Sequence, residues 1–360
     1  MAHGSSGAGN FTGVVMIESG LALLLLFSGS ASAANYDLPP LLTTTEQFKG
    51  ARAAFEFCFW QQRAFEIARE QHPDMAQTAM LVEQQFHERT GDGCGSLDRL
   101  WQRSAEAIEP GKWPSVRATL VEKAMPAIQD NLDELSDRSV AEQFIEQVRG
   151  GSEGKLDAAI ASQLVRASEG FRKRPSDLWP RWTHTWDSAT SPDAQGLAVR
   201  VRVPLSFAEA GPNGKNMLQK WTLPLEIDGT HVMLNVSHNT FSIGDSLLRA
   251  VAAFEQGSRK QWGAYLDGIA ADMTLLSSKR VTALGRPALM LEIEADGSPT
   301  DRLGRLRTHM LIALVPTGYV SSACVVAVPK GQLAQLDILA DRYAPLCLAF
   351  LSSLTDASQP

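Results

Sequence analysis

Apolar residues recur at intervals of three and four along the first half of the chain, between residues 43 and 187. This interval places them on one face of an amphipathic helix. Breaks at His72-Pro73, Gly91-Asp92-Gly93 and Gly150-Gly151 divide the pattern into segments. The pattern predicts an all-helical domain over residues 43–187, with helices over 43–71, 75–88, 97–108, 114–132, 140–148, 156–165 and 175–187. In the first helix, threonines at 43–45 can act as caps, and the apolar face holds Phe48, Ala51, Phe55, Cys58, Gln62 and Phe65.

From about residue 194 the apolar period changes to two, which is the period of a half-buried strand. The last two strands are apolar on both faces, so we expect helices on both sides of their sheet. The prediction is an α+β chain, in which the helical domain precedes a mainly antiparallel α/β/α sandwich of about six strands over residues 195–354. The predicted strands cover 197–203, 217–227, 231–236, 273–281, 287–295, 306–315 and 319–328, with helices over 246–269 and 345–354.

The first 33 residues have the pattern of a secretory signal. An apolar run, LALLLLF at Leu21–Phe27, is followed by SGSASA, which ends in the cleavage-type triplet Ala31-Ser32-Ala33. The run is too short to span a bilayer. We therefore expect an exported protein, periplasmic or secreted, with no transmembrane helix in the mature chain; a merely apolar N-terminus is the alternative.

Charge and cysteine content narrow the class of protein. A net charge of −7 disfavours nucleic acid and anionic membranes as partners. Four cysteines in an exported chain favour two disulfides, and no cysteine or histidine spacing is typical of a zinc site. Of the three connectivities, Cys58–Cys94 with Cys324–Cys347 is favoured because each pair lies within one half of the chain. Four free thiols are the alternative.

Three segments of the second half resemble the PsbP-like and DcrB-like sandwich family. They are Pro204-Leu205-Ser206-Phe207 at the end of a strand, Gly285-Arg286-Pro287-Ala288 at a hairpin, and Phe350-Leu351-Ser352-Ser353-Leu354 in the closing helix. The resemblance covers residues 195–354 and implies an accessory, binding or assembly role in the cell envelope. It places no ligand-binding residue on this chain. The helical half, in its CFWQQRAFEIAREQHPDM segment, is similar to exported bacterial proteins of unknown role.

One short motif is typical of an enzyme. Gly244-Asp245-Ser246-Leu247 matches the nucleophile block of an esterase and lipase superfamily, in which the serine attacks with the help of a histidine base. His309 is the one histidine further along the chain, and it lacks the aspartate three residues before it that the superfamily pattern requires. We therefore favour a helix cap at Asp245 or Ser246.

Three tryptophans form the second candidate site. Trp179, Trp182 and Trp186 are spaced by three and four, which places them on one face of the helix predicted over 175–187. Such a face can bind a ligand or partner, although packing between the two halves is the favoured interpretation. His231 and His238 lie on opposite faces of a strand, so we expect no metal and no other cofactor.

Together these patterns predict an exported, non-catalytic binding or accessory protein of the bacterial cell envelope. Its expected partner is an envelope protein or a small apolar ligand. The alternative is an esterase-like hydrolase that uses Ser246 and His309. A third possibility is a structural subunit that oligomerises through its helical half.

Overall fold

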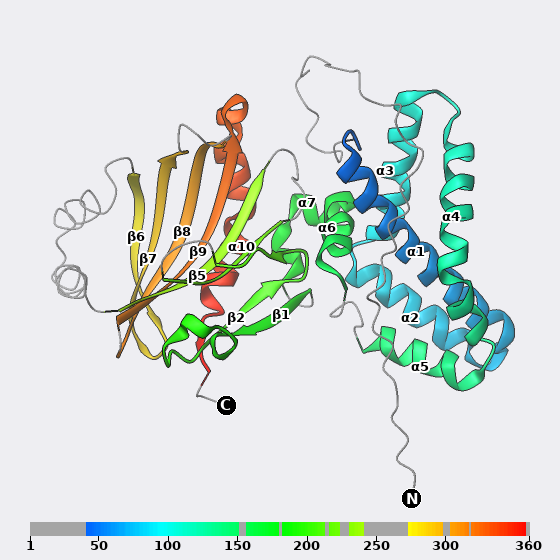
Figure 1. Cartoon of the computed structure of the whole chain (residues 1–360), viewed down its shortest axis with the longest axis horizontal. Coiled ribbons are helices and arrows are strands. Elements are labelled where there is room, and N and C mark those ends of the chain that lie inside the picture. The colour runs from blue at the N-terminus through cyan, green and yellow to red at the C-terminus, as the bar shows by residue number, and fades with distance from the viewer. Residues whose placement is uncertain are drawn as a thin grey trace, which may run out of the picture. The chain divides into compact units, whose positions relative to one another are not determined.

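The computed structural model describes most of the chain after residue 40 (Figure 1). All of these residues belong to one compact unit, Tyr36–Pro360. The predicted signal segment, the hairpin turn at Asp228-Gly229 and the helix over 246–269 lie outside them. The described residues are 41–150, 156–179, 182–212, 216–223, 230–240, 273–297, 303–316 and 318–357.

The described part of the first half is helical, as predicted, up to residue 173. The first helix begins with a capping box, in which the Thr44 hydroxyl accepts from the Gln47 N–H at 3.2 Å and the Gln47 side chain bonds back to Thr44. The helices are α1 Thr45–Gln71, α2 Ala76–Arg89, α3 Gly93–Ile108, α4 Trp113–Glu134, α5 Arg138–Arg149, α6 Ala158–Ala167 and α7 Glu169–Lys173.

Helix α1 is the central element of this region, since it packs against α2, α3, α4 and α6. Two apolar clusters meet along it. Phe55 belongs to the cluster that also contains Leu97 and Leu164, and Phe65 belongs to the cluster with Phe86 and Phe144. The interval of three and four along α1 therefore marks a helix that is buried among several neighbours.

The helix predicted over residues 175–187 is wrong. A short 3-10 helix covers Pro175–Leu178, and the strand β1, Thr183–Asp187, follows. β1 pairs antiparallel with β2, Val199–Pro204, and places Trp186 opposite Val201. Threonine and tryptophan favour strands over helices, and the available partner strand decides between the two states.

The second half is built on a seven-stranded sheet, in which every neighbouring pair is antiparallel. The strand order is β3-β4-β5-β9-β8-β7-β6, and β10 joins β1 and β2 in a second, three-stranded sheet. Six of the seven predicted strands belong to the large sheet, the strand predicted over 197–203 is β2 of the smaller sheet, and the two-residue strand β3 was not predicted. The strands of the large sheet are β3 Ala208–Glu209, β4 Met217–Thr222, β5 His231–Thr240, β6 Met273–Ala283, β7 Arg286–Asp296, β8 Leu303–Val315 and β9 Gly318–Pro329, and β10 is Thr355–Asp356.

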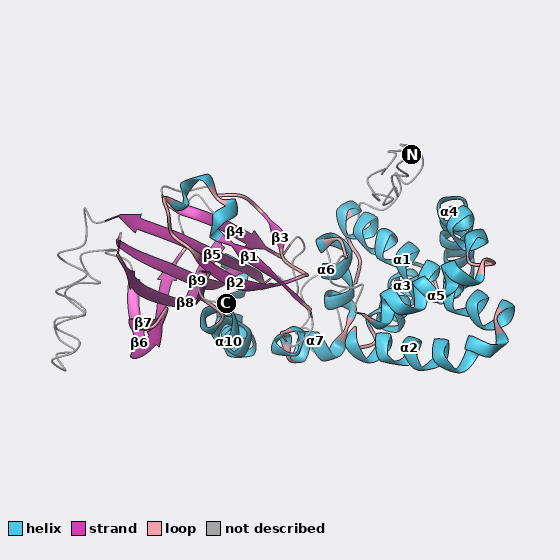
Figure 2. Cartoon of the chain, turned by 90° about the horizontal axis from the view of Figure 1, so that it is seen from below, coloured by secondary structure: helices cyan, strands magenta, loops and turns pink. Residues whose placement is uncertain are grey.

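Helix α10, Leu336–Ser352, lies along one face of the large sheet beside β8 and β9 (Figures 1 and 2). The core between them contains Trp221, Leu234, Val326 and Phe350. The predicted helix over 345–354 began too late, because Pro345 lies inside α10 rather than at its start. Burial of the apolar side of α10 outweighs the cost of about 3 kcal/mol of an interior proline.

The fold class is therefore α+β, with helices first and an antiparallel sheet after them, as the sequence predicts. The second covering layer of the sandwich was assigned to residues 246–269, which lie outside the described residues.

Candidate functional site

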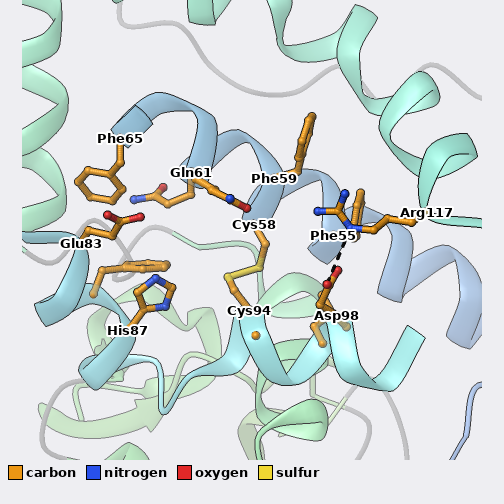
Figure 3. Close-up of a pocket in the computed structure, with 14 residues that line it drawn as sticks. Phe55, Cys58, Phe59, Gln61, Phe65, Glu83, His87, Cys94, Asp98 and Arg117 are labelled. Carbon is orange, nitrogen blue, oxygen red and sulfur yellow. Dashed lines mark ion pairs between the residues drawn. A yellow bond between two sulfur atoms is a disulfide. The ribbon is translucent and has the colours of Figure 1, made fainter. Parts of the chain in front are cut away.

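A pocket of about 300 Å³ lies in the helical region between α1, α2 and α3, and Arg117 of α4 also lines it (Figure 3). Much of its wall is aromatic. Phe55 and Phe59 stack with ring centres 6.1 Å apart and planes 7° from parallel, and Phe65 and Phe86 add two more rings. The volume is at the lower end of the range for small-molecule sites.

The disulfide Cys58–Cys94 forms part of the wall and joins α1 to α3, with the two Cα atoms 5.5 Å apart. In Figure 3 it lies between a group of residues from α1 and α2 on one side and the Asp98–Arg117 pair on the other. A second disulfide, Cys324–Cys347, joins β9 to α10 at a Cα separation of 5.3 Å. The predicted connectivity is the one that the structure contains.

Two residues of the pocket lining each carry a buried polar atom that has no hydrogen-bond partner among the described residues. The Gln61 side chain is 3% exposed, and its Nε2 forms no hydrogen bond with any described residue. The same holds for Nδ1 of His87, within the described part of the chain. Buried polar groups are hydrogen-bonded in the great majority of cases, although other described residues away from the pocket, such as Gln163 and Ser206, also carry buried polar atoms without a partner.

The charged groups of the pocket differ from these two atoms because each has a partner. Glu83 forms an ion pair with Arg69, and Asp98 lies 3.9 Å from Arg117. Burial raises the pKa of the Asp98 carboxyl above its usual range, although the charges of Arg117 and Arg99 act in the opposite direction. The carboxylate is therefore held in a partly desolvated position at one side of the pocket.

The signal for this site in the sequence was the apolar face of the first helix, which includes Phe55, Cys58, Gln62 and Phe65. That face was predicted as packing surface, and its role as a pocket wall was missed. Gln61 was not singled out, because one buried glutamine next to an exposed one leaves no trace in the residue pattern.

The structure separates the three tryptophans that were expected on one helical face. Trp182 is 1% exposed and packs on Phe171, with ring centres 5.5 Å apart, in the cluster that includes Leu205. Trp186 packs edge to face on Trp221 inside the sheet core, at 5.4 Å.

Trp179 is partly buried, and the Arg202 guanidinium lies 5.1 Å from the centre of its ring. The expectation of a common helical face is therefore wrong, because the segment forms a short 3-10 helix over Pro175–Leu178 and then the strand β1.

The residues of the esterase hypothesis are only partly described. Ser246 lies outside the described residues, so its pairing with His309 stays a prediction. His309 is on β8, 8% exposed, and burial lowers its pKa, while the charge of Glu292 on β7 acts in the opposite direction.

Glu292 and Glu294 of β7 lie beside Arg307 of the neighbouring strand β8. Arg307 of β8 lies 2.7 Å from Glu294 and 3.9 Å from Glu292, and it also reaches Asp337 of α10 at 2.6 Å. Both glutamates therefore share the face of the sheet that α10 covers.

Neither a metal site nor a membrane span is seen in the described part of the chain. There, no three histidine, cysteine or carboxylate side chains are grouped so that they could hold a metal ion. Among the same residues, no helix is both long enough and apolar enough to cross a membrane.

No protein-family model matches the chain, and no curated protein matches it in sequence. Among solved structures it is similar to cyanobacterial PsbP from Synechocystis sp. PCC 6803, at 10% identity over 48% of this chain and 92% of that one, with a TM-score of 0.27. A protein from Bacteroides thetaiotaomicron VPI-5482 is 14% identical over 49% of this chain and 48% of that one, with a TM-score of 0.25.

A protein of unknown function from Pseudomonas aeruginosa is 10% identical over 41% of this chain and 88% of that one, with a TM-score of 0.22. These similarities are too weak to carry an argument about function, and the fold description rests on the strands and helices themselves.

Proposed function

We propose that this chain is an exported, non-catalytic binding protein whose helical region holds a small apolar ligand in the pocket between α1, α2 and α3. We also propose that residues 195–354 belong to the PsbP-like and DcrB-like sandwich family, on the strength of the three sequence segments named above. The two disulfides support export, because such bonds persist in oxidising compartments.

The observation that carries the binding proposal is the pocket of about 300 Å³ between α1, α2 and α3. A ligand there contacts the partly buried ring of Phe59 and the disulfide Cys58–Cys94, whereas the other three phenylalanine rings of the lining are only 1–4% exposed. Apolar surface together with a few placed polar groups, here Asp98 and Arg117, is the usual composition of a small-molecule site.

The direct test is to fill the pocket from within. Gln62 lines the pocket but is itself exposed, and its amide donates to Glu66 at 2.9 Å within α1. A Gln62→Trp variant therefore places an indole at the cavity without removing a buried group. Gln84→Trp is the matched control, because Gln84 is an exposed α2 residue outside the pocket lining whose amide donates to Glu88 at 2.9 Å.

The mature chain and both variants are incubated with a small-molecule extract of bacterial envelopes, and bound compounds are identified by native mass spectrometry. We expect a compound that binds the wild type and Gln84→Trp and is lost from Gln62→Trp. A compound that binds all three proteins equally would place binding elsewhere, and no bound compound would contradict the proposal.

A further inference from the structure

We infer that the outer edge of β6 binds an extended, acidic segment of a protein partner, which pairs with β6 as a further strand of the large sheet. This site lies outside the helical pocket, so the inference goes beyond the proposed function and does not depend on it. Three features of β6 lead to it, and they are its position in the sheet, its length and its positive charge.

The position of β6 leaves one side of its backbone available. The strand order of the large sheet places β3 at one edge and β6 at the other (Figure 1). Within the described part of the chain, β7 is the one strand that pairs with β6, and no turn or loop bonds to its backbone. Alternate N–H and C=O groups of such a strand point away from its neighbour, so they can pair with a further strand.

The length of β6 is unusual for an edge strand, because edge strands are commonly short. β3 at the other edge has 2 residues, whereas β6 has 11. A bulge interrupts the β6–β7 register between Leu275 and Ser277, and from Ser277 to Ala283 the register is continuous. This continuous stretch, residues 277–283, is called the β6 edge. It is as long as an average strand, so an extended segment can pair along all of it.

The charge of the β6 edge determines which segment fits. Lys279 and Arg280 are both exposed, and no acidic residue occurs between Met273 and Leu291. As neighbours in a strand, the two basic side chains point to opposite faces of the sheet. A partner strand with two consecutive carboxylates opposite them forms one opposite-charge pair on each face, and such cross-strand pairs stabilise a sheet.

The same charges disfavour a second copy of this chain as the occupant. Residue 280 is the midpoint of 277–283, so two copies paired antiparallel over the whole β6 edge would place one Arg280 opposite the other. Like charges directly opposite each other are destabilising, and lysine on an edge strand is a common protection against pairing between copies. The β6 edge therefore favours a strand of opposite charge.

Three fluorescein-labelled peptides test the proposal. The acidic peptide is Thr-Val-Glu-Glu-Thr-Val, whose glutamates lie opposite Arg280 and Lys279 in antiparallel register, and the basic peptide has two lysines in their place. The third is the acidic peptide with both glutamate nitrogens methylated. Adjacent residues direct their N–H groups to opposite sides, so one of the two methyl groups blocks a hydrogen bond to β6 in either register.

Binding to the full mature chain is measured by fluorescence anisotropy. We expect the acidic peptide to bind the wild type roughly tenfold more tightly than the basic peptide. The methylated peptide should also bind roughly tenfold more weakly than the acidic one, because it lacks a backbone donor.

A charge-reversed double variant, Lys279→Glu with Arg280→Glu, should invert the preference and bind the basic peptide more tightly. The matched control is Lys112→Glu with Lys123→Glu, which makes the same change of charge at two exposed positions of the helical region. It should keep the preference of the wild type. Circular dichroism shows that each variant is folded, and the comparison of the three peptides on the wild type stands without the variants.

Four results would overturn the proposal. Equal binding of the acidic and basic peptides to the wild type, or no binding of either, would exclude selection of an acidic strand. A preference that the charge-reversed variant retains would place binding elsewhere. Equal binding of the methylated peptide would mean charge attraction without strand pairing. A wild-type dimer, seen by analytical ultracentrifugation and dissociated by the acidic peptide, would make a second copy the occupant.

Discussion

Gln61 is buried in the helical region with an amide nitrogen that no described residue accepts from. Gln61→Leu removes this unpaired donor and keeps a good helix former of similar size. We therefore expect the ligand-free variant to be more stable than the wild type by about 1 kcal/mol. Urea unfolding measures the difference.

Gln62→Leu is the matched control for this prediction, because Gln62 is exposed and hydrogen-bonded to Glu66. It should change the free energy of unfolding by less than about 0.5 kcal/mol. A Gln61→Leu variant that is clearly less stable than Gln62→Leu would mean that the buried amide has a partner in the folded protein.

The Asp98 carboxyl makes the stability of the folded protein depend on pH. Burial raises its pKa in the folded protein, so the folded state keeps that proton to a higher pH than the unfolded chain does. Within this window unfolding releases a proton, and stability falls as pH rises. Asp98→Asn removes the titrating group, so the stability of the variant relative to the wild type should increase from about pH 4 to pH 7.

The measurement for Asp98 is a series of urea unfolding curves across this range. Asp130→Asn serves as the control, since Asp130 is an exposed residue of α4. If the stability relative to the wild type changed with pH in the same way for Asp98→Asn and Asp130→Asn, the assignment of a raised pKa to Asp98 would be wrong.

At the residue scale, the sequence predicted the face of the first helix but not its cavity. Phe55, Cys58 and Phe65 follow the interval of three and four, and this indicates burial whatever lies opposite. Whether the space beside this face of α1 is filled depends on how closely α2 and α3 pack against α1. That distance is a property of the assembled helices. For the same reason the sequence does not distinguish buried Gln61 from exposed Gln62.

At the scale of single elements, the segment with the three tryptophans shows how a helical interval can be misleading. Spacings of three and four occur in Trp179, Trp182 and Trp186, yet β1 pairs with β2, and Trp182 lies in a different apolar cluster from Trp179 and Trp186. In a segment this short, pairing with a neighbouring strand has more influence on the secondary structure than the spacing of the apolar residues has.

The unequal burial of Trp186 and Trp179 predicts unequal effects of substitution. Trp186 is 7% exposed in the sheet core, so Trp186→Ala should cost about 3–5 kcal/mol of stability. Trp179 is only partly buried, and Trp179→Ala should cost about 1 kcal/mol. Urea unfolding measures the loss of stability in both variants. Equal losses would contradict the difference in burial between Trp186 and Trp179.

The disulfide Cys58–Cys94 holds α1 and α3 together across 36 residues of chain. The Cys58→Ser and Cys94→Ser double variant should lose about 2–4 kcal/mol of stability, because the unfolded chain regains the freedom that the bond removes. Non-reducing peptide mapping of the wild type should recover the Cys58–Cys94 and Cys324–Cys347 linked peptides, and their absence would contradict the pairing.

At the scale of the whole molecule, the α+β class could be predicted because the apolar period changes once along the chain and each period persists over many residues. The order of strands in the large sheet could not be predicted in the same way. β5 pairs with its neighbour β4 on one side and with the distant strand β9 on the other, and pairings of the second kind depend on contacts between distant segments.

The central claim is that ligand binding takes place in the helical pocket. Hydrogen–deuterium exchange of the full mature chain, with and without the small-molecule extract of bacterial envelopes, tests it most directly because it monitors every region at once. We predict slower exchange in α1 and α2 around the pocket, with the strands of the large sheet unchanged. Slower exchange confined to the sheet, or no change anywhere, would contradict the claim.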